Sequence, residues 1–397
     1  MNTPKIRFKG FTDDWEQRKL GEIVLRESLA RESTIDLPYV EYEDVIAEEG
    51  RINKDIRKKE GIKKGIFFDG SQVLYGKLRP YLHNWLNPDF SGVAVGDWWV
   101  LKPNNVDKNF IYRLIQTQQF DDIANQSTGS KMPRADWNLV SNTEFAIPTS
   151  QVEQTKIGGY FFTLDNLITL HQRKCDETKE LKKYMLQKMF PKNGEKNPEI
   201  RFEGFTDDWE QRKLIDYLDV SNEKNKKGDY KKTDVLSVSG EVGIVNQIEF
   251  QGRSFAGVSV ENYGIVNEGD VVYTKSPLKA NPYGIIKTNK GKAGIVSTLY
   301  AVYKPKENTD SDFVQIYFEL DSRMNSYMHP LVNKGAKNDM KVSDENALKG
   351  TVTFPKINEQ KAISNFITEL DHRITLHQRK CEKLKELKKF MLQNMFV

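Results

Sequence analysis

The chain has 397 residues, 38% hydrophobic and 29% charged, which is enough for two or three domains with cores of their own. No run approaches the roughly eighteen apolar residues of a membrane span, and the N-terminus lacks the apolar stretch of a secretion signal. We therefore expect a cytoplasmic protein that makes no membrane contact. A net charge of +4 permits nucleic-acid binding without requiring it, and two cysteines exclude a disulfide framework.

A block at the start of the chain returns in its middle. Residues 4–20 have the sequence PKIRFKGFTDDWEQRKL, and residues 198–214 match it at fifteen of seventeen positions. A glycine in each copy, Gly10 or Gly204, marks a turn. We predict that each block docks its repeat onto the long helices described below and offers a surface to partners. Six aromatic residues would carry this docking: Phe8, Phe11, Trp15, Phe202, Phe205 and Trp209.

Each block is followed by a longer segment that differs between the two repeats. In the first of these bodies, residues 93–101 (VAVGDWWVL) are rich in β-branched and aromatic residues and predict one strand. Residues 109–124 have helical spacing of apolar residues and predict one helix. The second body follows the same plan with different residues. Such strands and helices predict an α/β fold for both bodies.

Each repeat ends in a segment with the periodicity of a long helix. The string ITLHQRKC occurs at residues 168–175 and again at 374–381. Apolar residues recur at steps of three and four, which is typical of a coiled-coil seam. Further along, the apolar residues Leu181 and Leu387 break this spacing, so the sequence predicts a slip of the seam there.

The two long helices are expected to pack on each other in an antiparallel pair, because each is polar on most of its circumference. An ordinary core-facing helix would show a similar stripe, and only the duplication favours pairing. Ser150 and Glu153 predict a capping box at the first helix, whereas the second has Lys356 in place of the serine. The predicted domains are residues 1–20 (docking segment), 21–149 (first body), 150–190 (first helix), 191–214 (linker and docking segment), 215–356 (second body) and 357–397 (second helix).

Motifs for catalysis are weak. Residues 87–90 (NPDF) differ by one residue from the loop of amino-methyltransferases, but no glycine-rich cofactor loop follows a strand. His171 with Cys175, and His377 with Cys381, could meet in a tetrahedral metal site if the helices cross there. Filling a buried layer is the simpler interpretation, so we predict neither a catalytic residue nor a metal site.

Basic residues recur at matched places in the two bodies, which is typical of nucleic-acid recognition by contacts to phosphates and base edges. A single charged run is usually only a solvated face. Recurrence favours DNA contacts by eight residues: Lys77, Arg79, Lys131, Arg134, Lys275, Lys279, Lys337 and Lys341.

The order of repeated block, variable body and long helix, occurring twice, resembles the specificity subunit of type I restriction-modification systems. Local strings are similar to those of the family: GSQVLYGKLRP at residues 70–80, NEGDVVYTK at 267–275, and the Glu-Gln pairs at 153–154 and 359–360. The resemblance covers essentially the whole chain. The body strings diverge after the matched lysines, so a base-reading role cannot be carried from one body to the other.

This resemblance implies two target-recognition domains separated by two antiparallel helices that form a coiled coil. Each domain would recognise half of a bipartite double-stranded DNA target. The helices would dock two modification subunits, and restriction subunits that translocate DNA would join them. The chain itself would hold no cofactor, while S-adenosylmethionine, ATP and magnesium would bind the partner subunits. A fused methyltransferase-nuclease, or a coiled-coil scaffold without a nucleic-acid role, are the alternatives.

Overall fold

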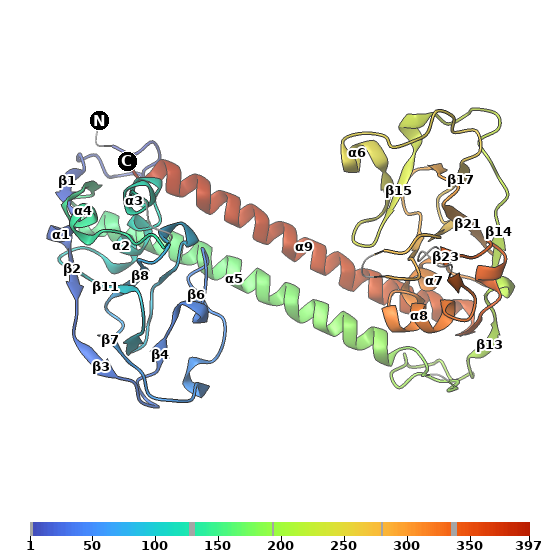
Figure 1. Cartoon of the computed structure of the whole chain (residues 1–397), viewed down its shortest axis with the longest axis horizontal. Helices are drawn as coiled ribbons and strands as arrows, with labels where there is room; N and C mark the ends of the chain where they lie inside the picture. Colours follow the sequence, from blue (N-terminus) through green and yellow to red (C-terminus); the bar gives the residue numbers. More distant parts are fainter. Residues whose placement is uncertain (1–2, 127–131, 193, 279–280, 335–339) are drawn as a thin grey trace. The chain divides into compact units, whose positions relative to one another are not determined.

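A computed structural model of the chain describes residues 3–126, 132–192, 194–278, 281–334 and 340–397, without the side chains of residues 333, 334, 340 and 341. The chain divides into two compact units (Figure 1). Unit 1 comprises Met1–Arg173 and His377–Val397, and unit 2 comprises Lys174–Leu376. Each unit therefore contains one variable body and a part of both long helices.

Unit 1 is built mainly from short antiparallel strands. Its strands are β1 (Glu16–Lys19), β2 (Val24–Glu27), β3 (Ala30–Glu32), β4 (Tyr39–Val40), β5 (Val45–Ile46), β6 (Arg51–Ile52), β7 (Lys64–Phe68), β8 (Val73–Gly76), β9 (Trp85–Leu86), β10 (Gly92–Ala94), β11 (Trp98–Pro103) and β12 (Glu144–Ile147). They form two four-stranded sheets, ordered β2-β11-β8-β9 and β3-β7-β10-β4, and two strand pairs, β1-β12 and β5-β6. Only β4 and β10 pair in parallel among these described strands.

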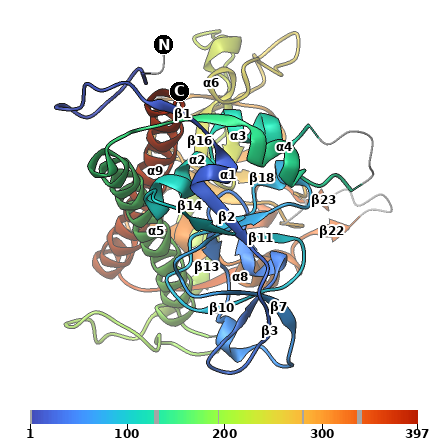
Figure 2. The same cartoon turned by 90° about the vertical axis from the view of Figure 1, so that its left-hand side faces the viewer.

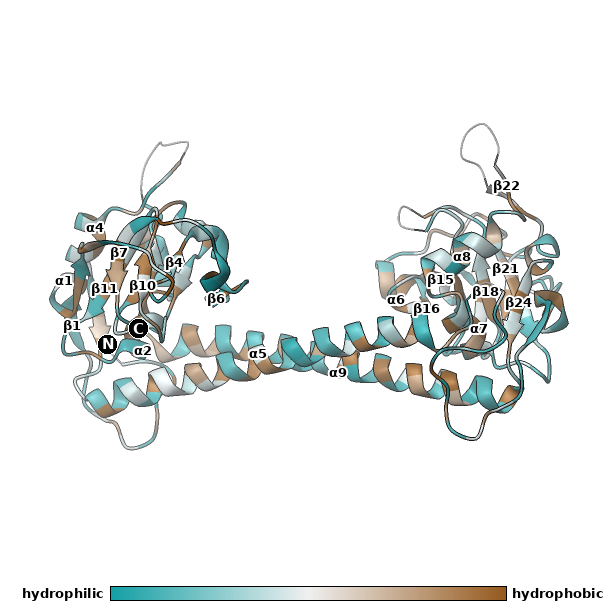
Figure 3. Cartoon of the chain, turned by 90° about the horizontal axis from the view of Figure 1, so that it is seen from below, coloured by the Kyte–Doolittle hydropathy of each residue, from teal (hydrophilic) through white to brown (hydrophobic). Residues whose placement is uncertain are grey.

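Strand β11 separates two hydrophobic cores of unit 1. Because successive side chains of a strand point to opposite faces, Trp99 and Leu101 enter one core while Trp98 and Val100 enter the other. Apolar residues, brown in Figure 3, lie along β10 and β11. The larger core also takes in the short helices α1 (Leu20–Ile23), α2 (Lys108–Leu114), α3 (Gln118–Ala124) and α4 (Trp137–Asn142).

Two predictions for the first body are wrong in detail. The run at residues 93–101 is not one strand, because Gly96 has a φ of +99° and turns the chain between β10 and β11. The predicted single helix at residues 109–124 is two helices, α2 and α3. Thr117 accepts a hydrogen bond from the Phe120 amide through its hydroxyl and thereby starts the second helix.

Unit 2 repeats this plan. Its strands are β13 (Glu210–Lys213), β14 (Leu218–Val220), β15 (Leu236–Ser239), β16 (Gly243–Asn246), β17 (Gly264–Val266), β18 (Val271–Thr274), β19 (Ile286–Thr288), β20 (Gly294–Val296), β21 (Tyr300–Pro305), β22 (Asn333–Lys334), β23 (Met340–Lys341) and β24 (Thr351–Phe354). Its short helices are α6 (Gln247–Gln251), α7 (Ser311–Tyr317) and α8 (Asp321–Met328). Strand β21 has the place of β11, with Tyr303 in one core and Val302 in the other.

The long helices α5 (Gln151–Lys188) and α9 (Ile357–Met395) confirm the two predicted helical segments. In unit 1 the first part of α5 lies beside the last part of α9 (Figure 2). Phe161 of α5 is 6.2 Å from Phe396, the residue after α9, between ring centroids. In unit 2 the last part of α5 meets the first part of α9, where Lys182 bonds Asp371 at 2.6 Å. Early residues of one helix thus meet late residues of the other, so the pairing is antiparallel.

The predicted slip of the seam is wrong. Leu181 and Leu387 are 42% and 40% exposed, and the next residue of each helix, Lys182 or Lys388, occupies the packed position instead. Each lysine has an aspartate of the opposite helix as partner: Lys182 bonds Asp371 at 2.6 Å and Lys388 bonds Asp165 at 2.8 Å. The spacing of three and four therefore continues, because a paired lysine can bury its methylene stem.

Each long helix is fastened to its own repeat by a Glu-Gln pair near its start. Glu153 accepts two hydrogen bonds from Arg7, at 2.6 and 2.8 Å. In unit 2, Glu359 accepts two from Arg201, at 2.7 and 2.8 Å. The predicted capping box at α5 is therefore only half formed: Ser150 Oγ accepts from the Glu153 amide at 3.4 Å, while the Glu153 carboxylate is engaged by Arg7.

The glutamines complete the fastening of helix to body. Gln154 accepts from the Asp107 amide at 2.9 Å and donates to the Pro148 carbonyl at 2.8 Å. Gln360 makes the same two bonds at the same distances, to Asp310 and Pro355. Each glutamine thus joins the start of α2 or α7 to the start of a long helix.

The repeated blocks pack against the long helices, as their aromatic residues predicted. Phe8 lies 6.0 Å from Tyr160 and Phe202 lies 5.8 Å from Phe366, edge to face. Trp15 and Trp209 are only 2% exposed in their own units. These indoles serve internal packing, and docking of another subunit on the four phenylalanines stays a prediction. Phe11 and Phe205 are half-buried.

The stabilities of two single variants should distinguish the observed seam from the predicted one. We expect Lys182→Ala to lower the free energy of unfolding by about 1–3 kcal/mol, because it leaves carboxylates without their cation and removes a buried stem. Leu181→Ala should cost less than about 1 kcal/mol, since the side chain is largely exposed. Denaturant unfolding of the full chain measures both. A larger loss for Leu181→Ala would contradict the structure.

Candidate nucleic-acid interface

Three of the predicted basic residues come together in unit 1. The loop that follows β8 pairs with the segment that precedes α4: the Arg79 amide donates to the Pro133 carbonyl at 2.7 Å, and the Ala135 amide donates to the Lys77 carbonyl at 2.8 Å. A β-bridge between Leu78 and Arg134 lies between these bonds. This pairing places Lys77, Arg79 and Arg134 on adjacent backbone segments. We call these three residues the basic cluster.

Asp97 contacts two of the three residues of the basic cluster. Its carboxylate accepts from Arg134 Nε at 3.2 Å and from Arg134 Nη2 at 3.0 Å, and Lys77 Nζ lies 3.6 Å away. The hydrogen bond from Arg134 lowers the pKa of the Asp97 carboxyl below its ordinary value, against a smaller effect of burial. Asp97 is therefore ionised at neutral pH. One carboxylate against three cations leaves the cluster with a net positive charge, which favours an anionic ligand.

Tyr42 fixes the backbone beneath the basic cluster. Its hydroxyl accepts from the Leu78 amide at 2.9 Å and donates to the Asp97 carbonyl at 2.8 Å. Burial raises the pKa of Tyr42 well above its ordinary value, so the hydroxyl keeps the proton that it donates. The loop around Lys77 and the turn around Asp97 are thereby held together.

Arg79 has an unusual backbone conformation. Its φ is +49°, in the left-handed region that only a few per cent of residues other than glycine adopt. His83, four residues later, has a φ of +54°. Such strain concentrates at functional sites, where the surrounding structure holds it in place. The buried Nε of Arg79 has no hydrogen-bond partner among the described residues.

In unit 2, Lys275 stands where Lys77 stands in unit 1. The Lys275 amide donates to the Leu299 carbonyl at 3.0 Å, just as the Lys77 amide donates to Asp97 at 2.9 Å. The side-chain partner differs, because Lys275 Nζ bonds Asp344 at 2.8 Å. The backbone frame is thus shared by both bodies while the side-chain network is not.

The other predicted contact residues cannot be placed. Lys131, Lys279 and Lys337 lie outside the residues that the structure describes. Lys341 belongs to β23, where it pairs with Asn333, and its side chain is not described. Sequence reasoning missed Tyr42 and Asp97, which organise the cluster. The only local signal was the Gly96-Asp97 turn within a strand-like run.

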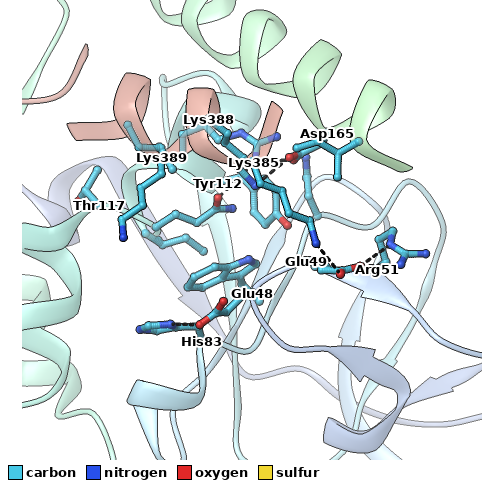
Figure 4. Close-up of a pocket in the computed structure, with 18 of the residues that line it drawn as sticks. Glu48, Glu49, Arg51, His83, Tyr112, Thr117, Asp165, Lys385, Lys388 and Lys389 are labelled. Carbon is cyan, nitrogen blue, oxygen red and sulfur yellow. Dashed lines mark hydrogen bonds and ion pairs between the residues drawn. The ribbon is translucent and has the colours of Figure 1, made fainter. Parts of the chain in front are cut away.

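A cavity of about 660 Å³ lies between the first body and the long helices within unit 1 (Figure 4). Lys385, Lys388 and Lys389 of α9 line one side. Lys385 Nζ lies 3.5 Å from Glu49, and Asp165 binds both Lys388 at 2.8 Å and Arg113 at 2.7 Å. Burial lowers the pKa of Lys388, against the attraction of Asp165. These ion pairs connect the first body to both long helices. The residues around the cavity therefore hold the body and the helices together.

The histidines of the repeated string meet where the two long helices pack together. His171 Nδ1 and His377 Nδ1 are 3.0 Å apart. Cys175 and Cys381 each place their sulfur 4.0 Å from a backbone carbonyl of the opposite helix, that of Ile374 or Ile168. Within the described part of the chain, no three side chains of metal-binding type gather around one point.

Comparison with known proteins identifies the family. Residues 12–180 and 206–386 match a family model for the type I restriction modification DNA specificity domain. The chain belongs to this family. It is a specificity subunit of the type I restriction-modification class, a non-catalytic component that provides DNA recognition. The resemblance inferred from the sequence is thus confirmed, and the alternatives of an enzyme or a scaffold without a nucleic-acid role are set aside.

Two relatives span essentially the whole chain. The putative type I restriction enzyme MjaX specificity subunit of Methanocaldococcus jannaschii is 23% identical, over 96% of this chain and 87% of the relative. The crystal structure of the type I restriction-modification system S subunit from M. genitalium has a TM-score of 0.61 at 12% identity, and the match covers 100% of this chain and 99% of that one. This likeness shows a shared fold.

None of the helices in the described residues is long and apolar enough to cross a bilayer.

Proposed function

We propose that the two bodies of this specificity subunit are target-recognition domains, each of which recognises one half of a bipartite double-stranded DNA sequence. The proposal rests mainly on one observation. The two bodies share a backbone arrangement but place different side chains on it. Lys77 and Lys275 occupy the same backbone position, yet Asp97 holds the first and Asp344 the second. A common scaffold that presents different polar groups suits the recognition of two different half-sites.

The long helices would form a coiled-coil spacer that sets the gap between the half-sites and docks two modification subunits. The proposal is supported by two exposed apolar pairs at equivalent places: Leu181 with Tyr184 on α5, and Leu387 with Phe390 on α9. These four side chains are between 40% and 52% exposed. Equivalent apolar surfaces suit two copies of one partner.

The remaining parts of the complex follow from the family resemblance. Restriction subunits would join the modification subunits and translocate DNA. S-adenosylmethionine, ATP and magnesium would bind to these partners, and the complex would act in the cytoplasm. The chain would contribute the sequence specificity and the geometry of assembly.

Reconstitution tests the function. The purified chain alone should neither methylate nor cleave DNA. Mixed with a modification subunit and S-adenosylmethionine, it should direct methylation to one bipartite sequence, found by methylation-sensitive sequencing of a DNA library. Methylation at a continuous site, or methylation by the modification subunit that does not depend on the chain, would contradict the proposal.

Charge placed on one apolar pair should remove one modification subunit. We expect the double variant Leu387→Lys with Phe390→Lys to lower the stoichiometry from two modification subunits to one, because lysines would be desolvated in the interface. Light scattering of the purified complex measures this. Val152→Lys is the control, since Val152 is 61% exposed but has a polar residue, Asn358, at the equivalent position. An unchanged stoichiometry in the double variant would exclude this surface.

Lengthening both helices should widen the gap in the target. His171 and His377 face each other, so seven residues inserted after each would add one matched heptad and about 10 Å. DNA rises about 3.4 Å per base pair, so we expect the gap to grow by about three base pairs with both half-sites unchanged. Methylation-sensitive sequencing gives both quantities. A changed half-site with an unchanged gap would show that the helices do not set the distance.

A further inference from the structure

We propose that Arg134 recognises a guanine in the half-site of the first body, and that Asp97 is the positioning residue that orients the Arg134 guanidinium for it. This inference rests on the proposed function, because it requires that the first body contact base edges. It goes beyond that function by assigning a base to a residue.

The geometry of the ion pair leaves one edge of Arg134 available. A guanidinium carries five N–H donors in a planar fork, and pairs of them can bind two acceptors side by side. Asp97 takes the edge formed by Nε and Nη2, at 3.2 and 3.0 Å. The edge formed by Nη1 and Nη2 is not used by this carboxylate. The Arg134 side chain is 52% exposed, so a ligand can reach it.

That edge matches guanine. In the major groove guanine presents two acceptors, O6 and N7, whereas adenine presents an acceptor and a donor and cytosine a donor. Two parallel N–H groups therefore pair with guanine and meet a like donor on adenine. A lysine in this place would still donate to guanine O6 and N7, although without the planar fork. A methionine, which the second body has at the equivalent position, would donate to neither. Phosphate would also accept from this edge, so the test must separate the two ligands.

The surroundings hold the arginine in advance. Tyr42 ties the backbone at Asp97 to the backbone at Leu78, and Leu78 forms a bridge with Arg134 itself. A recognition side chain whose partner and backbone are both fixed loses less conformational entropy when it binds. Lys77, 3.6 Å from Asp97, supplies a second cation beside the first. Both features favour a DNA-facing role for the pair.

The second body has other residues at the equivalent sequence positions. The residue that corresponds to Arg134 by the repeat offset is Met340, and the carboxylate near Lys275 comes from Asp344. The guanine contact is therefore assigned to the first half-site alone. The second half-site then serves as an internal control in every experiment.

The test uses the complex of the full chain with its modification subunits. Replacing the guanine by 7-deazaguanine removes the N7 acceptor and keeps the Watson–Crick pairing. We expect roughly a tenfold to hundredfold weaker binding for the parent chain, the range typical of a good two-donor contact. Arg134→Met should weaken binding to normal DNA by a similar factor and be insensitive to 7-deazaguanine, because methionine has no N–H to donate to N7.

Methylation-sensitive sequencing with Arg134→Met should show relaxed preference at that one base, and Asp97→Asn should show a smaller relaxation at the same base. Asp344→Asn is the matched control, and its preference in the first half-site should equal that of the parent. An Arg134→Met variant that keeps the parent preference, or a first half-site without guanine, would overturn the inference. A parent complex that methylates no bipartite site would instead overturn the proposed function.

Discussion

Two equivalent ion pairs between the long helices are the constraint on which both units depend. Asp165 pairs with Lys388 in unit 1, and Asp371 pairs with Lys182 in unit 2. These four residues occupy equivalent positions of the two helices, which share the string ITLHQRKC. In a parallel, in-register pairing, aspartate would face aspartate and lysine would face lysine. The same residues that stabilise the antiparallel arrangement therefore destabilise the parallel one, which gives the pairing its direction.

Each body is attached to this helix pair in the same way. Glu153 and Glu359 each bind an arginine of the repeated block, and Gln154 and Gln360 each bond a backbone amide of the body. Because these bonds are buried or partly buried, removing one partner would leave a polar group unsatisfied. The attachment is thus constant, while the loops that follow β8 and β18 differ. Under the proposed function, this division would let the recognised sequence change without altering how the subunits assemble.

The sequence predicted the long helices, the repeated blocks and the basic residues, but it misplaced the seam at Leu181 and Leu387. The spacing of apolar residues assigns a leucine to the packed position. In the structure a lysine occupies that position, because an aspartate on the other helix compensates the charge of the lysine. That aspartate is distant in sequence. The run VAVGDWWVL was predicted as one strand, since the alternation of residues does not reveal the positive φ of Gly96. Lys77, Arg79 and Arg134 were predicted from their charge. Asp97 and Tyr42 were not predicted at all.

The sequence by itself determined the tandem duplication, the length of the helices and the family. These follow from identity between repeats and from periodicity, which are read from the order of residues alone and do not depend on contacts made after folding. Only the tertiary structure decided which basic side chains form ion pairs with carboxylates and which side chains pack between the long helices. Those outcomes depend on desolvation and on contacts such as Arg134 with Asp97, 37 residues apart in the chain. Local sequence patterns do not encode such contacts, because the energy of a charge depends on what surrounds it after folding.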